Sequence, residues 1–357
     1  MPEVRLNKTL SDFIEDFSIA LFKIKNKKKS DLKAFQECSS IEYNDIQSVY
    51  KDCQLFESCS IYNPPAFVGS RIRHKVQTSI FKMDSMFKPV PIFQKPYDSL
   101  PENKQIYFEE IKNLRSDAKE KTCLVYLHGF SESGYTPEKI LIFKELIAKM
   151  PEMEVLAVQL PYHMMRSPKN QPYSGAYFLD SYPIVTIESF RQAVNDVSQV
   201  LSYAKEKYKN VIVAGFSLGG FVVSFLGTCD DRADLYIIGQ AGVHIPKTLI
   251  NLSICPGLSE KKDNLIKQGV DFESLFEPIE LSNYQSILPS EKVISIAGLY
   301  DKLIAFEDVE MLRCFFNGVY NINYSAGHRG IIFEMKKIKM RIMKIIDSMA
   351  TQGYTNL

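Results

Sequence analysis

Residues 210–229 read NVIVAGFSLGGFVVSFLGTC, and this stretch decides the fold. Its β-branched start, Val211 to Gly215, predicts a buried strand, and the apolar run Leu218 to Gly227 predicts a helix. The glycines between them predict a sharp strand-to-helix turn with Ser217 at its tip, because small residues on both sides let the strand and the helix pass close together. The unpaired N–H groups at the start of the helix favour negative charge. The turn therefore suits a nucleophile whose reaction builds an oxyanion.

The motif alone is a hypothesis, because a glycine-rich turn without chemical meaning has the same pattern. A serine hydroxyl becomes a good nucleophile when a histidine takes its proton and a carboxylate orients that histidine. Asp301 follows the predicted strand Lys292 to Gly298, and His328 follows the predicted strand Val319 to Tyr324. We therefore predict Ser217, Asp301 and His328 as the catalytic residues, with Glu307 or Asp308 as alternatives for the acid.

Acyl transfer also needs two N–H groups that bind the oxyanion. One candidate is the backbone N–H of Leu218, directly after the serine. The second is the backbone N–H of Phe130, in the loop His128-Gly129-Phe130 that follows the predicted strand Cys123 to Leu127. We expect His128 to brace this loop and to take no part in the chemistry.

The rest of the chain alternates strands and helices, which predicts an α/β fold with a mostly parallel sheet covered on both faces. Residues 63–99 carry short apolar stretches between prolines, as at an antiparallel sheet edge, and residues 101–121 read as a helix or loop. We divide the chain into an N-terminal helical extension (1–62), a core (63–243 and 290–357) and a cap over the site (244–289). The further strands and helices that we predict are 137–150, 155–160, 187–208, 235–239, 306–316 and 331–349.

Composition excludes several classes of function. The net charge of +1 gives no overall attraction to nucleic acid, and no uncharged apolar run is long enough to span a bilayer. Seven scattered cysteines without a C-x-x-C pair favour reduced thiols and a cytoplasmic location over disulfides or a metal site.

The segment from Leu10 to Ile24 has apolar residues at helical spacing, and the basic run KIKNKKK ends at Lys29. Two interpretations stay open: a helix docked on the core, or peripheral membrane contact through residues 10–29.

From about Cys123 to Met349 the chain resembles the α/β-hydrolase superfamily, through the H-G-F loop, GFSLGG, the Asp301 segment and the Gly327-His328 pair. The resemblance implies a serine hydrolase of esters, thioesters or lipids without a cofactor. Three residues after a strand, Tyr162, His163 and Arg166, are candidates for substrate binding, since an arginine can hold a carboxylate or phosphate. The alternatives are a non-catalytic binding or scaffolding protein, and an acyltransferase or peptidase that uses the same triad.

Overall fold

The computed structural model describes residues 8–25, 35, 38, 46–51, 53–135, 142–180, 182–251, 256–318 and 320–352. The strands are β1 (Ala66–Arg73), β2 (Val76–Asp84), β3 (Gln105–Asn113), β4 (Thr122–Leu127), β5 (Met153–Val158), β6 (Asn210–Phe216), β7 (Leu235–Gly239), β8 (Val293–Gly298) and β9 (Tyr320–Tyr324). The α-helices are α1 (Lys8–Lys25), α3 (Ile46–Tyr50), α4 (Gln94–Asp98), α6 (Lys144–Lys149), α7 (Pro183–Lys207), α8 (Leu218–Leu226), α9 (Ile245–Asn251), α10 (Pro256–Lys267), α11 (Phe306–Phe316) and α12 (Ile331–Gln352). Short 3-10 helices are η3 (Pro91–Phe93), η4 (Pro101–Lys104), η6 (Met164–Arg166), η7 (Ser274–Ile279), η8 (Leu281–Asn283) and η9 (Ser290–Lys292).

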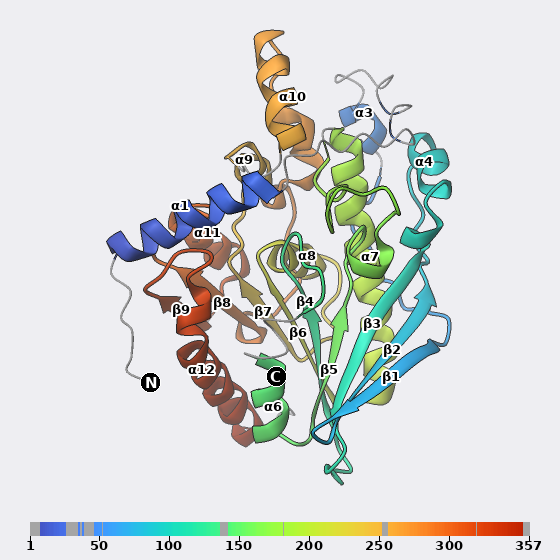
Figure 1. Cartoon of the computed structure of the whole chain (residues 1–357), viewed down its shortest axis with the longest axis vertical. Helices are drawn as coiled ribbons and strands as arrows, with labels where there is room; N and C mark the ends of the chain where they lie inside the picture. Colours follow the sequence, from blue (N-terminus) through green and yellow to red (C-terminus); the bar gives the residue numbers. More distant parts are fainter. Residues whose placement is uncertain are drawn as a thin grey trace.

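One sheet organises the molecule (Figure 1). Within the described residues it has nine strands in the order β1-β2-β3-β5-β4-β6-β7-β8-β9. The pairs from β1 to β5 are antiparallel, and those from β5 through β4 to β9 are parallel. The carboxyl ends of the parallel strands therefore meet at one edge, where ligands bind in open α/β sheets.

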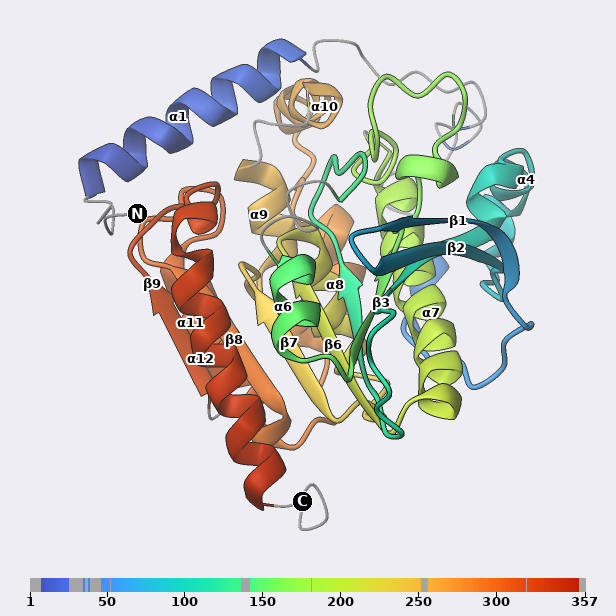
Figure 2. The ribbon, with the colours of Figure 1, turned by 60° about the horizontal axis from the view of Figure 1, so that its bottom comes forward.

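Alternate residues of the central strands point to opposite faces, as a pleated strand requires. Cys123, Val125 and Leu127 of β4 pack in the core that α7, α8 and α11 cover. Leu124 and Tyr126 pack in the second core, beneath α6 and α12, which lie on the near side of the sheet in Figure 2. Both faces of the sheet are thus covered, as the alternation of strands and helices predicted.

The predictions hold for the parallel strands and for the helices around the site, with ends that shift by a few residues. Two are wrong. Residues 105–113 form β3, where we expected a helix or loop, and residues 91–93 form η3, where we expected an edge strand. Most of the segment 30–45, residues 26–29 of the basic run, residues 137–141 of a predicted helix and Val319 lie outside the described residues.

Parts of the proposed extension and of the proposed cap pack into the core. Phe56 is buried and stacks on Phe225 of α8, with ring centroids 4.2 Å apart, so this part of the extension is packed into the core. In the region 244–289, Leu275 and Phe276 of η7 are buried, and α9 lies at the carboxyl edge of the sheet (Figure 1). A separate cap unit stays a proposal.

No helix among the described residues combines the length and apolar character needed to cross a bilayer.

Candidate active site

Ser217 stands at a strained turn between β6 and α8. Its backbone has φ 56° and ψ −118°, a conformation that a residue with a side chain rarely adopts. Its N–H donates to Gly239 O at 2.9 Å, and its carbonyl accepts the Phe221 N–H at 3.0 Å, so the turn is fixed on both sides. A Cβ at Gly219 would lie only 2.7 Å from the Leu127 carbonyl carbon, which explains why glycine is needed where the helix passes β4.

Ser217, His328 and Asp301 lie in a row. His328 Nε2 is 2.9 Å from Ser217 Oγ, and His328 Nδ1 is 2.7 Å from Asp301 Oδ2. When Nδ1–H donates to the carboxylate, Nε2 is left to accept the serine proton. These are the contacts that a serine nucleophile, a general base and an orienting acid require.

The loops that carry Asp301 and His328 are fixed by further hydrogen bonds. Asp301 Oδ1 accepts the N–H groups of Leu303 and Ile304, both at 2.9 Å, which directs Oδ2 at the imidazole. Gln240, just after β7, donates from Nε2 to the carbonyl oxygen of His328 at 2.7 Å. The acid and the base therefore have little freedom to turn away from each other.

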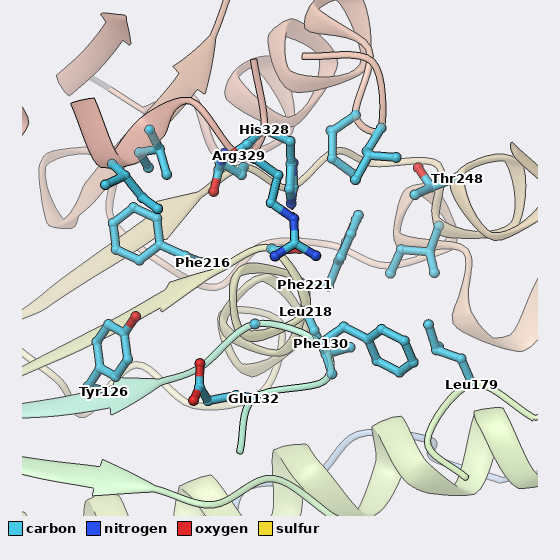
Figure 3. A pocket seen from close by; sticks show the side chains of 18 of the residues that line it. Tyr126, Phe130, Glu132, Leu179, Phe216, Leu218, Phe221, Thr248, His328 and Arg329 are labelled. Atoms are coloured by element: carbon cyan, nitrogen blue, oxygen red, sulfur yellow. Dashed lines mark hydrogen bonds between the residues drawn. The ribbon is translucent and has the colours of Figure 1, made fainter. Parts of the chain in front are cut away.

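The loop after β4 lies against the serine. Gly129, Phe130, Ser217 and Leu218 line one pocket, so the two residues predicted to donate to an oxyanion share the pocket of the serine. The N–H of Leu218 opens α8, where no carbonyl of the same helix can accept it. The phenyl ring of Phe130 points along the pocket toward Leu179 in Figure 3.

His128 is buried beneath this loop. Its Nε2 accepts the Leu160 N–H at 3.1 Å, and its Nδ1 lies 2.8 Å from Gly129 O. Burial lowers the pKa of His128 to about 4, so the ring is neutral near pH 7 and keeps one tautomer. These contacts are those of the bracing role that we expected from the sequence.

The pocket extends on both sides of the serine and histidine. In Figure 3, Tyr126 and Phe216 lie on one side of Arg329, and Leu179 and Thr248 lie on the other. Its lining is mostly apolar: Phe130, Ile142, Leu179, Phe190, Phe216, Leu218, Phe221, Ile245, Leu303, Ile304, Ile331, Ile332 and Met335. A ligand with apolar groups on both sides of a reacting carbonyl would fit this shape. Among the described residues, no group of three or more His, Cys, Asp or Glu side chains is arranged to hold a metal ion.

Tyr162, His163 and Arg166 are not among the residues that line this pocket, which is evidence against the expectation that they bind substrate. All three side chains are essentially fully buried. Arg166 forms an ion pair with Asp196 of α7, with Nη2 2.6 Å from Oδ2, and donates to the carbonyl oxygen of Gln159. The charge of Arg166 is thus neutralised inside the protein and is not presented to a ligand.

Three residues at the site were not predicted. Gln240 follows β7 directly, and its position at a strand end was the available signal. Arg329 lines the pocket, and its guanidinium lies between the labelled side chains of His328 and Phe130 in Figure 3. Glu15 of α1 is fully buried beside His328, and only the apolar spacing around it suggested that this helix docks on the core.

The sheet, the strained turn and the three side chains define a protein of the α/β-hydrolase class. The model of the family described as "Alpha/beta hydrolase domain containing 18" matches residues 45–311. The chain therefore belongs to this family.

Solved structures with the same fold include two acetyl xylan esterases. The acetyl xylan esterase from Paenibacillus sp. R4 is 13% identical with a TM-score of 0.54, over 91% of this chain and 98% of that one. Acetyl xylan esterase 1 from Thermoanaerobacterium sp. JW/SL YS485 is 14% identical with a TM-score of 0.52, over 86% and 99% of the two chains. At these identities the likeness shows the fold alone. No curated protein has a significant match to the chain.

Proposed function

We propose that the protein hydrolyses carboxylic esters through an acyl-enzyme on Ser217. The observation that carries the proposal is the unbroken row from Ser217 Oγ through the His328 imidazole to Asp301, inside an apolar pocket. The fold class also supports it, because α/β-hydrolases commonly place a serine at this turn.

In the proposed reaction Ser217 Oγ attacks the ester carbonyl while His328 Nε2 takes the hydroxyl proton. The N–H groups of Leu218 and Phe130 stabilise the negative oxygen of the tetrahedral intermediate. When the intermediate collapses, the C–O bond to the alcohol breaks and His328 returns the proton to the leaving alcohol. Water then attacks the acyl-serine with His328 as base, which releases the acid and restores the serine.

The apolar lining favours esters with apolar substituents on both the acyl and the alcohol side. Arg329 and Glu132 both line the pocket and place one positive and one negative charge in it. An alcohol or amine acceptor in place of water would make the same acyl-enzyme an acyltransferase, so the acceptor distinguishes the two activities.

The test compares wild type with Ser217→Ala on nitrophenyl esters of graded acyl length, together with phospholipids and acylglycerols. Ser217→Ala should lower kcat on the order of 10⁶-fold, as loss of a triad nucleophile does. Ser224→Ala is the matched control, because its hydroxyl donates to Gly220 O within α8 and Ser224 is not among the residues that line the pocket. Equal turnover by wild type and Ser217→Ala would refute the proposal.

A fluorophosphonate probe separates the enzyme from a scaffold of the same fold. We expect the probe to modify wild type at Ser217, identified by peptide mass spectrometry, and to leave Ser217→Ala unlabelled. Folded wild-type protein that takes up no label would favour the non-catalytic alternative.

We further infer a peripheral contact with a lipid surface through α1. Leu10, Phe13 and Phe17 are 42%, 67% and 56% exposed on this helix, and the rings of Phe13 and Phe17 stack with centroids 6.2 Å apart. An apolar helical face of this kind inserts into lipid headgroups. The double variant Phe13→Ser/Phe17→Ser should float with liposomes less than wild type. Equal flotation of the two proteins would refute the contact with lipid through α1. A cytoplasmic location stays a prediction.

A further inference from the structure

The first helix of the chain contacts the loop that carries His328. In Figures 1 and 2, α1 is the blue helix above β9, a strand from the far end of the sequence. On α1, Ser11 is 1% exposed and Glu15 is 0% exposed, whereas their neighbours are half-buried or exposed. Ser11 and Glu15 are four residues apart and share one face of the helix. This face meets residues 327–329.

Three successive N–H groups of the histidine loop are bound by these two side chains. Gly327 N–H donates to Ser11 Oγ at 2.7 Å, and His328 N–H donates to Glu15 Oε1 at 2.9 Å. Arg329 N–H donates to Glu15 Oε2 at 3.4 Å. Without α1, these backbone groups would lose their acceptors next to the imidazole.

The sequence of the loop permits this close approach. A Cβ at Gly327 would lie 2.8 Å from the Glu15 carboxyl carbon and 2.9 Å from the carbonyl oxygen of Tyr300. Glycine is therefore the residue that leaves room for the carboxyl group against the main chain.

A second contact joins α1 to the loop of the acid. Lys302, next to Asp301, forms ion pairs with Asp16 at 2.9 Å and with Asp12 at 3.7 Å. Thus one helix touches both loops that face Ser217.

Burying the carboxyl group of Glu15 costs free energy. Burial, and after it the nearby charge of Asp301, raises the pKa of Glu15, while His328 and the two N–H bonds lower it. An apolar side chain would pack here without this cost. The hydrogen bonds to the histidine loop are what Glu15 adds.

We propose that Ser11 and Glu15 are positioning residues, which hold residues 327–329 so that the His328 imidazole bridges Asp301 and Ser217. The proposal rests on the proposed function for its effect on turnover. It places α1 in the catalytic assembly, although α1 contributes no group that touches the substrate. A displacement of about 1 Å at such a site costs about 100-fold in rate.

The test uses the full chain with Glu15→Ala, Glu15→Gln and Ser11→Ala. Ser18→Ala is the matched control, since Ser18 is a half-buried serine on the same helix. Ester kinetics at pH 7.5 give kcat and KM, and amide hydrogen exchange reports on residues 327–329. Thermal melts followed by circular dichroism show that each variant is folded.

We expect Glu15→Ala to lower kcat by about 10-fold to 100-fold with KM within about twofold, and to speed exchange at residues 327–329. Glu15→Gln keeps one acceptor oxygen and should recover part of kcat. Ser18→Ala should match wild type. If Glu15→Ala fails to fold, Ser11→Ala removes one bond only and should give a smaller loss of kcat with faster exchange at Gly327.

Wild-type kcat and wild-type exchange in a folded Glu15→Ala protein would overturn the proposal. A loss of kcat without faster exchange at residues 327–329 would overturn it too. Failure of the proposed function has a different signature, because Ser217→Ala would then turn over ester like wild type. The exchange measurement would still show whether α1 holds the loop.

Discussion

The buried His128 beneath the oxyanion loop predicts how the fold responds to acid. Its pKa falls from 6.5 to about 4 because burial disfavours the charged ring. Above pH 6.5 the ring is neutral in both the folded and the unfolded chain, and its contribution to stability is fully present. As the pH falls below 6.5 the unfolded chain takes up a proton that the folded chain cannot, so stability is lost until the pH reaches the folded pKa near 4.

The size of this loss follows from the shift. Between pH 7.5 and pH 5 the unfolded ring goes from mostly neutral to almost fully protonated while the folded ring stays mostly neutral, which lowers the free energy of unfolding by about 2 kcal/mol. The variant His128→Gln keeps an acceptor for the Leu160 N–H but cannot titrate. It should be less stable than wild type at pH 7.5, yet lose about 2 kcal/mol less on transfer to pH 5.

The assay is urea unfolding at pH 7.5 and pH 5, followed by circular dichroism because the chain contains no tryptophan. The neighbouring buried His163 is coupled to it, because burial and, after it, the charge of His128 lower the pKa of His163, so the difference between the two proteins belongs to the pair of rings. His74→Asn in the exposed turn between β1 and β2 is the control and should keep the wild-type response. An identical loss of stability in wild type and His128→Gln would refute the reasoning.

Two further predictions concern a close contact of the main chain and a buried ion pair. Gly219→Ala should prevent stable folding or lower Tm strongly, since its Cβ would meet the main chain of Leu127, whereas Gly69→Ala, with no atom within 4 Å of the added Cβ, should melt like wild type. Arg166→Leu should destabilise the fold by about 3 to 5 kcal/mol in urea unfolding, because it leaves the buried Asp196 carboxylate unpaired, and the folded fraction should keep the wild-type KM. A raised KM with unchanged stability would instead restore Arg166 as a substrate-binding residue.

The elements around Ser217 could be predicted because their signals are local. The β-branched run of β6, the glycines of the turn and the apolar run of α8 lie within twenty residues of sequence. β3 was missed because its charges suggested solvent exposure. In the structure, Glu110 of β3 is buried and paired with Lys112 and with Lys207 of α7, and the second partner cannot be seen from a local pattern.

The same limit explains what the sequence could not show at the site. From the sequence alone, Arg166 is a candidate to bind a ligand. In the structure it forms an ion pair with Asp196 of α7, which the sequence does not place beside it. In the sequence, Glu15 is one of several acidic residues on a predicted amphipathic helix. The N–H group that its carboxylate binds belongs to His328, more than three hundred residues away. Partners that only the tertiary fold brings together decide both cases.

The bond between Glu15 and His328 also has a consequence for the order of events on the ribosome. The two residues are 313 positions apart, so at 5–20 residues per second about 15 to 60 seconds separate their synthesis. Through that interval α1 has been made but its docking surface is incomplete. A nascent chain released before residue 328 would carry the nucleophile without its base, and its first helix would lack the N–H groups of residues 328 and 329 that Glu15 binds.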